Sequence, residues 1–151
     1  MSFPDGYTDT IQNVGSGELM DSAHINKTTS DFEDLLVVGR FAKLDAGTLS
    51  NMDGSATPAI GGVVVRDVAA PLESGGVINK ALHADPRVVY CTSGLITVEV
   101  KAGEVPVIGQ PVFASNAGDA NDGTAIIAAG EATGAVFFQE IKTGVWSIHV
   151  K

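Results

Sequence analysis

The stretch that decides the fold runs from Arg87 to Val112 and reads RVVYCTSGLITVEVKAGEVPVIGQPV. In its middle, Ile96, Val98 and Val100 alternate with polar residues, which are Thr97, Glu99 and Lys101. Strict alternation predicts a strand with one face on a core and the other face in water. The segment Cys91-Thr92-Ser93-Gly94 predicts a tight turn before this strand, with a preceding strand at residues 88–90.

The same pattern of short apolar runs and turn residues continues on both sides, from Leu35 to the end of the chain. We expect about eight short strands, at residues 35–44, 60–70, 88–90, 95–101, 111–115, 124–129, 133–139 and 145–150. Gly39 is expected to mark a bulge in the strand 35–44. The continuous run of valines at residues 63–65 predicts burial on both faces of its strand.

Further expectations concern the remaining connections and the last strand. Residues 77–83 fit either a short helical turn or a strand, and Gly130-Glu131-Ala132 predicts a hairpin between its two flanking strands. In the last strand, alternation predicts buried Trp146, Ile148 and Val150, with Ser147 and His149 in solvent.

Short strands separated by frequent turns indicate an all-β fold, either a small β-barrel or a jelly-roll-like sandwich. We expect this body to span residues 35–151, preceded by an extended acidic N-terminal arm at residues 1–34. The arm holds seven acidic residues against one base, Lys27. Such a segment buries too little apolar surface to fold alone, so it is expected either to clamp a partner or to pack on its own domain. Its apolar anchors are the candidate contact residues: Phe3, Pro4, Tyr7, Ile11, Leu19, Met20, Ile25 and Phe32.

The formal net charge of −9 argues against binding to nucleic acid or to anionic membranes, because it repels phosphate groups. Cys91 is the single cysteine, so the chain forms no internal disulfide. The first ten residues lack the basic and apolar regions of a secretory signal, and no apolar run is long enough for a membrane span. We therefore expect a soluble protein made in a cytoplasm.

No motif in the chain predicts catalysis or a cofactor. His24, His83 and His149 are far apart in sequence, and none has the spacing of a metal pair. The residues 119–123, DANDG, lack the spacing and the closing glutamate of a calcium loop and predict a surface turn. Cys91 is expected to be a small buried apolar residue, because no neighbour would lower the pKa of its thiol.

The segment from Val100 to Val112 is similar to a turn of biotinyl and lipoyl carrier domains, with glycines at Gly103 and Gly109. In those families the modified lysine lies in a Met-Lys or Asp-Lys signature, and this chain has neither. The similarity therefore indicates a strand-loop-strand passage and not a carrier.

Taken in order, several segments resemble the capsid cement, or decoration, proteins of tailed bacteriophages. The N-terminal residues 3–7, FPDGY, are similar to the start of those proteins, and residues 37–41, VVGRF, resemble their first body strand. The segment from Gly94 to Phe113 resembles their central strand-loop-strand, and residues 145–150 resemble their closing strand. Residues 71–85 have no counterpart in this resemblance.

The resemblance implies a structural protein without enzymatic activity on the outer surface of an icosahedral phage head. Its partners would be the major capsid protein, whose subunit contacts it would stabilise, and further copies of itself in a homotrimer or a dimer. Many copies on one symmetric shell would gain strength through avidity. The alternative is a β-sandwich module of a phage particle that binds carbohydrate or associates with the tail.

Overall fold

A computed structural model describes residues 16–17, 19, 26–33, 35–55, 59–66, 72–82 and 87–151. These residues form an all-β fold, as the sequence predicts, with a large and a small sheet and one short 3-10 helix, η1 (Lys80–Leu82). The described residues hold twelve strands, more than the eight expected, because several span only two to four residues. The strands are β1 (Asn26–Phe32), β2 (Leu35–Val37), β3 (Phe41–Asp45), β4 (Thr48–Asn51), β5 (Ile60–Val64), β6 (Leu72–Glu73), β7 (Val77–Asn79), β8 (Arg87–Glu99), β9 (Pro111–Ala114), β10 (Ala125–Ile126), β11 (Glu131–Lys142) and β12 (Val145–Val150).

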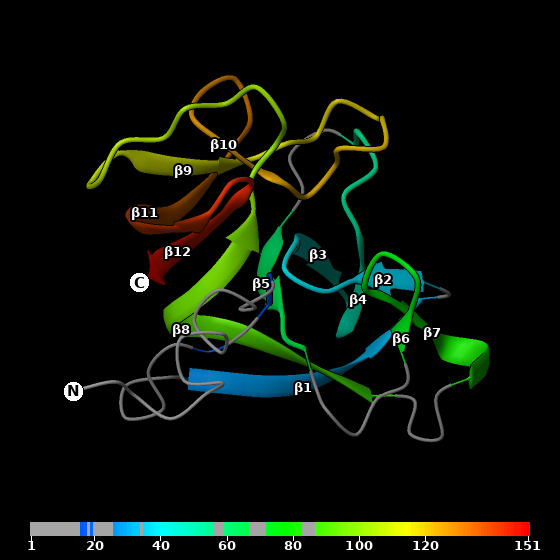
Figure 1. Cartoon of the computed structure of the whole chain (residues 1–151). Helices are drawn as coiled ribbons and strands as arrows, with labels where there is room; N and C mark the ends of the chain where they lie inside the picture. The colour runs from blue at the N-terminus through cyan, green and yellow to red at the C-terminus, as the bar shows by residue number, and fades with distance from the viewer. Residues whose placement is uncertain are drawn as a thin grey trace.

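β8 is the central strand of the molecule (Figure 1). It is a single strand of 13 residues, so the tight turn expected at residues 91–94 is wrong. Its first part pairs with β1 and β5, and its second part, from Gly94 to Glu99, pairs with β12. Gly94, with φ of 109°, lies where the partner changes, and Figure 1 shows that the ribbon of β8 bends along its length. The sequence signal at Gly94 therefore marks a bend, which glycine accommodates without a Cβ.

The first part of β8 belongs to a closed ring of strands. β1 pairs in parallel with β4 and antiparallel with β8, which completes the order β1-β4-β3-β5-β8 into a ring. β3 and β4 form a hairpin that turns at Ala46 and Gly47, both of which have positive φ. Because β1 closes the ring, the sheet begins inside the range expected for the arm.

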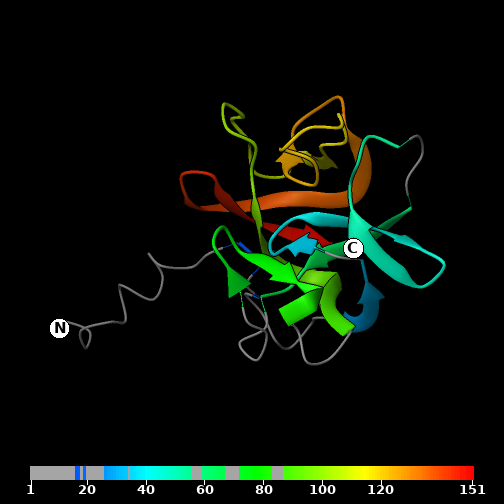
Figure 2. The same ribbon diagram turned by 90° about the vertical axis from the view of Figure 1, so that its right-hand side faces the viewer.

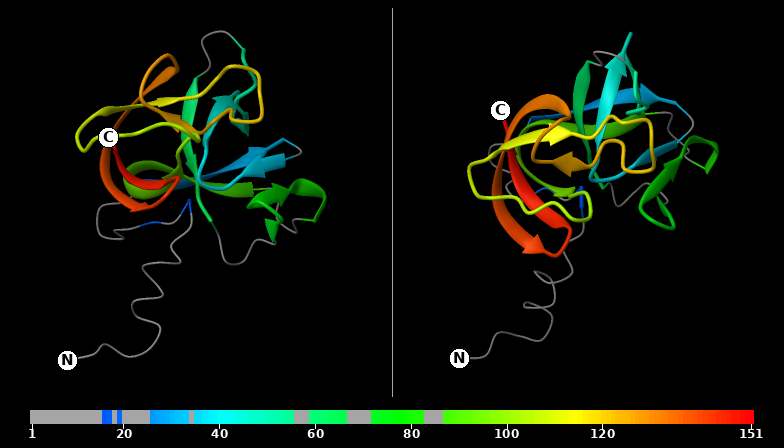
Figure 3. Two further views of the ribbon diagram at one scale, coloured as in Figure 1. Left: turned by 45° about the horizontal axis from the view of Figure 1, so that its top comes forward. Right: turned by 90° about the horizontal axis from the view of Figure 1, so that it is seen from above.

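The second part of β8 continues into the strands β12, β11, β9 and β10. Figure 3 shows these red, orange and yellow strands on one side of the body and the blue and cyan strands on the other. β10 and β11 both pair with β9, so the hairpin expected at Gly130-Glu131-Ala132 is wrong. A bridge between Val100 and Ala125 brings β10 back to the end of β8.

The stretch expected as one strand at residues 35–44 is two strands in different sheets. β2 pairs with β7 in the small sheet β2-β7-β6, whereas β3 lies in the large sheet. The chain turns between them at Gly39, with φ of 77°, so the glycine makes a turn and not a bulge. Residues 77–83 were expected to form either a strand or a short helical turn, and the structure has both, since β7 is followed by η1. His83 lies outside the described residues. Figure 2 shows β6, β7 and η1, in green, on the opposite side from the orange strand β11.

Two apolar clusters fill the body, on opposite faces of the shared strands. Val63 and Val65 belong to one cluster and Val64 to the other, so the expected burial on both faces is confirmed. On β8, the neighbouring residues Tyr90 and Cys91 likewise belong to different clusters. Each buried aliphatic or aromatic side chain contributes about 1.5–3 kcal/mol, so these clusters are the main stabilising feature.

The predicted faces of β8 and β12 are confirmed for the apolar residues and wrong for two polar ones. Trp146, Ile148 and Val150 are buried and His149 is exposed. Thr97 and Ser147, which were expected in solvent, are instead buried opposite each other across the pair. The Ser147 hydroxyl donates to the Gln139 carbonyl at 3.2 Å, and such a bond makes its burial acceptable.

Candidate functional site

The candidate contact residues of the N-terminal segment are the first place to look for a site. Phe3, Pro4, Tyr7, Ile11, Met20 and Ile25 lie outside the described residues. Phe32 is fully buried in the protein's own core, so its expected role as a neighbour contact is corrected. It was misassigned because β1 contains mainly polar residues, NKTTSDF, and shows no apolar alternation.

Leu19 also lies against the body. It forms an antiparallel bridge with Ile96 of β8 and packs, half-buried, on the core. Next to it, the Gly17 amide donates to the Thr97 carbonyl at 2.6 Å, and the Gly17 carbonyl accepts from the Arg66 amide at 2.8 Å. A Cβ at Gly17 would lie within 3 Å of the Gly39 nitrogen, so glycine is required at this crossing. The chain is therefore anchored on the body at Gly17 and Leu19.

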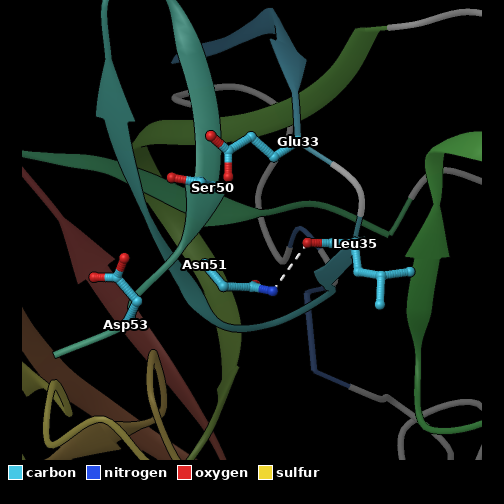
Figure 4. Close-up of a pocket in the computed structure, with 5 residues that line it drawn as sticks. All are labelled: Glu33, Leu35, Ser50, Asn51 and Asp53. Carbon is cyan, nitrogen blue, oxygen red and sulfur yellow. Dashed lines mark hydrogen bonds between the residues drawn. The ribbon is translucent and has the colours of Figure 1, made fainter.

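A shallow pocket of about 270 Å³ lies beside β4, lined by Glu33, Leu35, Ser50, Asn51 and Asp53 (Figure 4). Its Asn51 side chain donates to the Leu35 carbonyl at 2.9 Å, which ties β4 to β2. Asp53 accepts from Lys43 at 2.6 Å and from the Ser55 amide, and these bonds hold the pKa of its carboxyl far below the usual range. The carboxylate of Asp53 is therefore already engaged by its own chain, which is typical of a structural role.

The loop at residues 116–123 uses its carboxylates in the same way. Asp122 is buried, and its side chain accepts from the amides of Ala117 and Gly118 at 2.8–3.1 Å. Asp119 accepts from the Asn121 amide at 2.8 Å. Within the described part of the chain, no group of three or more His, Cys, Asp or Glu side chains is arranged to hold a metal ion.

Cys91 is buried, as expected, and its thiol lies 3.2 Å from the Ser93 carbonyl oxygen. Burial raises the pKa of this thiol, because the charged thiolate would lose its hydration. A thiol held neutral and away from solvent is a poor nucleophile. Cys91 therefore acts as a core residue.

The most distinctive exposed feature is the connection between β8 and β9, residues 101–110. Val105, Val107 and Ile108 are 77%, 63% and 69% exposed in the loop, and Phe138 of β11 is also exposed. We call these four residues, Val105, Val107, Ile108 and Phe138, the apolar loop surface. They are four of the six large apolar side chains that are exposed in the described residues. Single exposed apolar residues are ordinary, but a cluster of this kind indicates an interaction site.

A second pocket, of about 390 Å³, lies directly beside this loop. It is formed between residues 100–106 and the β11–β12 turn, and Trp146 contributes to its wall. Three charged residues line it: Lys101, Glu104 and Glu140. The pocket and the apolar loop surface share Val105, so we treat them together as one candidate site.

No helix among the described residues has the length and apolar character that crossing a membrane requires.

Comparison with solved structures places this fold among phage capsid proteins. A chain from "The capsid of Myoviridae Phage XM1" is similar over 100% of this chain and 98% of its own, with a TM-score of 0.84 and 28% sequence identity. The head fiber gp8.5 N base of bacteriophage phi29 covers 84% of this chain and 94% of its own, with a TM-score of 0.48 and 15% identity. A search of curated protein sequences gave no match.

Comparison with protein-family models gives the same result from sequence. The model of the XM1 gp53 minor capsid protein family matches residues 7–150, which is nearly the whole chain. The resemblance to phage capsid-associated proteins is therefore confirmed, and the protein belongs to the XM1 gp53 minor capsid protein family.

Proposed function

We propose that this protein is a cement protein that binds the outer surface of an icosahedral phage head and stabilises contacts between major capsid protein subunits. The observation that carries the proposal is the full-length similarity to a chain of the phage XM1 capsid. A minor capsid protein associates with a capsid, and a stable all-β body with an exposed apolar site suits attachment to a preformed shell.

The architecture supports a structural role in a second way. The carboxylates of Asp53, Asp119 and Asp122 accept hydrogen bonds from the protein's own chain. These hydrogen bonds hold the loops in fixed conformations, which suits a rigid structural protein. The net charge of −9 also disfavours the DNA-filled interior of a head and favours its exterior.

A carbohydrate-binding module is less well supported. Sugar platforms need several exposed aromatic rings. Trp146, Phe41 and Phe137 are buried, and among the described residues Phe138 is the one exposed aromatic side chain.

The test is reconstitution on heads assembled without this protein. Purified protein is mixed with such heads, and binding is measured by co-sedimentation and by cryo-electron microscopy of the particles. We expect saturable density on the outer surface between capsid subunits, and heads that release DNA at a higher temperature than undecorated heads. Absence of binding, or density on the inner surface, would refute the proposal. Native mass spectrometry of the free protein tests the associated expectation of a homotrimer or dimer.

A further inference from the structure

The apolar loop surface and its neighbouring pocket have the properties of a preformed docking site. Several backbone and side-chain hydrogen bonds fix the loop. The Glu104 amide donates to the Lys101 carbonyl at 3.1 Å, and the Gln110 amide donates to the Val107 carbonyl at 3.0 Å. The Val107 amide in turn donates to the Gln110 side chain at 3.0 Å.

A further hydrogen bond joins the loop to the sheet. The Gly109 amide donates to the Phe137 carbonyl at 2.7 Å, so Ile108 and Phe138 flank a shared hydrogen bond. Phe137 points into the core, where its ring packs edge-on against Trp146 with the centroids 5.6 Å apart. The loop is thus anchored to a strand whose Phe137 side chain is buried in the core. A loop held in this way loses little conformational entropy on binding.

The site projects from one end of the molecule. In Figure 1 the loop is the yellow-green trace that extends beyond β9, β11 and β12, far from the small sheet and η1. Figure 2 shows the same separation after a quarter turn. Among the described residues, the two large exposed apolar side chains outside the site are Leu35 of β2 and Leu82 of η1, which lie with the small sheet and provide matched controls.

The charges around the site indicate its occupant. The two segments that hold the apolar loop surface, residues 105–113 and 132–139, contain no charged residue, although the whole chain has a net charge of −9. At the pocket, the carboxylates of Glu104 and Glu140 outnumber the ammonium group of Lys101. The site therefore accepts apolar side chains accompanied by a basic residue, and it repels an acidic segment such as residues 1–34 of another copy.

We propose that the apolar loop surface and its pocket are the docking site for a capsid-shell segment that presents apolar side chains next to a lysine or arginine. This inference rests on the proposed function, because it identifies the part of the molecule that would hold the shell. Val107 and Ile108 insert as anchors, and Glu104 and Glu140 pair with the basic residue at the rim.

The experiment compares binding of variants to heads assembled without this protein. Val107→Ser combined with Ile108→Ser should weaken binding about tenfold or more, as loss of buried anchors does. The melting temperature should be unchanged, because both side chains are exposed. Glu104→Gln combined with Glu140→Gln should weaken binding at low salt and reduce its salt dependence. The control, Leu82→Ser, should bind like the wild type.

The outcomes separate this inference from the proposed function. If the wild-type protein does not bind heads, the proposed function fails. If the wild type binds and the Val107→Ser/Ile108→Ser variant binds within about twofold of it, the docking site is elsewhere. If that variant binds heads normally but loses self-association in sedimentation velocity, the surface is covered by a second copy and the assignment to the shell is wrong.

Discussion

The Arg40 guanidinium and the Glu99 carboxylate form a two-pronged ion pair that joins the turn after β2 to the end of β8. Arg40 Nε donates to Glu99 Oε2 at 2.8 Å, and its Nη2 donates to Oε1 at 3.0 Å. The remaining nitrogen, Nη1, donates to the carbonyls of Ala120 and Asp122. One side chain thus connects three segments that are up to 82 positions apart in the sequence.

Arg40→Ala should lower the free energy of unfolding by about 2–3 kcal/mol, because it breaks a charge-assisted fork and leaves two carbonyls without their donor. Arg40→Lys keeps the charge but not the planar fork, so it should recover part of this loss. Equilibrium urea unfolding measures both variants. A loss below about 0.5 kcal/mol for Arg40→Ala, the range of an ordinary surface substitution, would show that the contact is not structural.

Gly62 marks a close crossing of β5 and β8. A Cβ at this position would overlap the Cys91 carbonyl oxygen and lie 3.2 Å from the Tyr90 ring. Gly62→Ala should therefore cost about 3 kcal/mol or more, or prevent folding, since neither strand can move without disturbing a core. Gly134→Ala is the matched control: its φ is 76°, but nothing lies within 4 Å of the added carbon, so we expect a cost of about 1 kcal/mol. Similar melting temperatures for the two variants would contradict the steric argument.

The sequence predicts the all-β class and several turns because these depend on local chemistry. The strand at residues 145–150, which alternation predicts, is an example. It fails where the signal is not local. The residues at 91–94 have the composition of a turn, but their backbone groups pair with β1 and β5, which come from distant parts of the chain. The same residue types occur in tight turns and in strands that bend where they change pairing partners, so the local sequence does not distinguish the two.

The candidate site was harder to predict for a related reason. The loop at residues 101–110 was identified as a passage between strands, but the exposure of Val107 and Ile108 depends on how the turns orient them. Conversely, Phe32 follows a polar run and gave no sign of a core position, although it is fully buried. Burial of single apolar residues is decided by tertiary packing, which alternation alone does not specify.

The ion pair between Lys43 and Asp53 should give the protein a measurable sensitivity to acid. The hydrogen bond from Lys43, followed by the bonds from Ser55, lowers the pKa of Asp53 from its ordinary value of 3.8. A carboxyl whose pKa is lower in the folded state stabilises the fold above its unfolded pKa, and this contribution is lost as the pH falls. The wild type should therefore exceed Asp53→Asn in stability at pH 5, and the difference should shrink toward pH 2.

Urea unfolding of the wild type and Asp53→Asn over this pH range is the measurement. Lys43→Met should reduce the same pH-dependent difference, because it removes the first cause of the shift and leaves the hydrogen bonds from Ser55. Raised salt should also reduce the effect, since the pair is exposed. A difference that stays constant or grows as the pH falls would contradict this explanation.

The last prediction separates the N-terminal segment from the body. Gly17 and Leu19 hold the chain on β8, so deletion of residues 2–14 removes none of these contacts. The deletion should change the free energy of unfolding by less than about 1 kcal/mol, whereas Phe32→Ala, which empties a fully buried site, should cost about 3–5 kcal/mol. If Phe3, Tyr7 and Ile11 clamp a neighbouring subunit, the shortened protein should fold normally but occupy heads at lower density. Undiminished occupancy would show that this segment is not an arm, and would leave head attachment to the body alone.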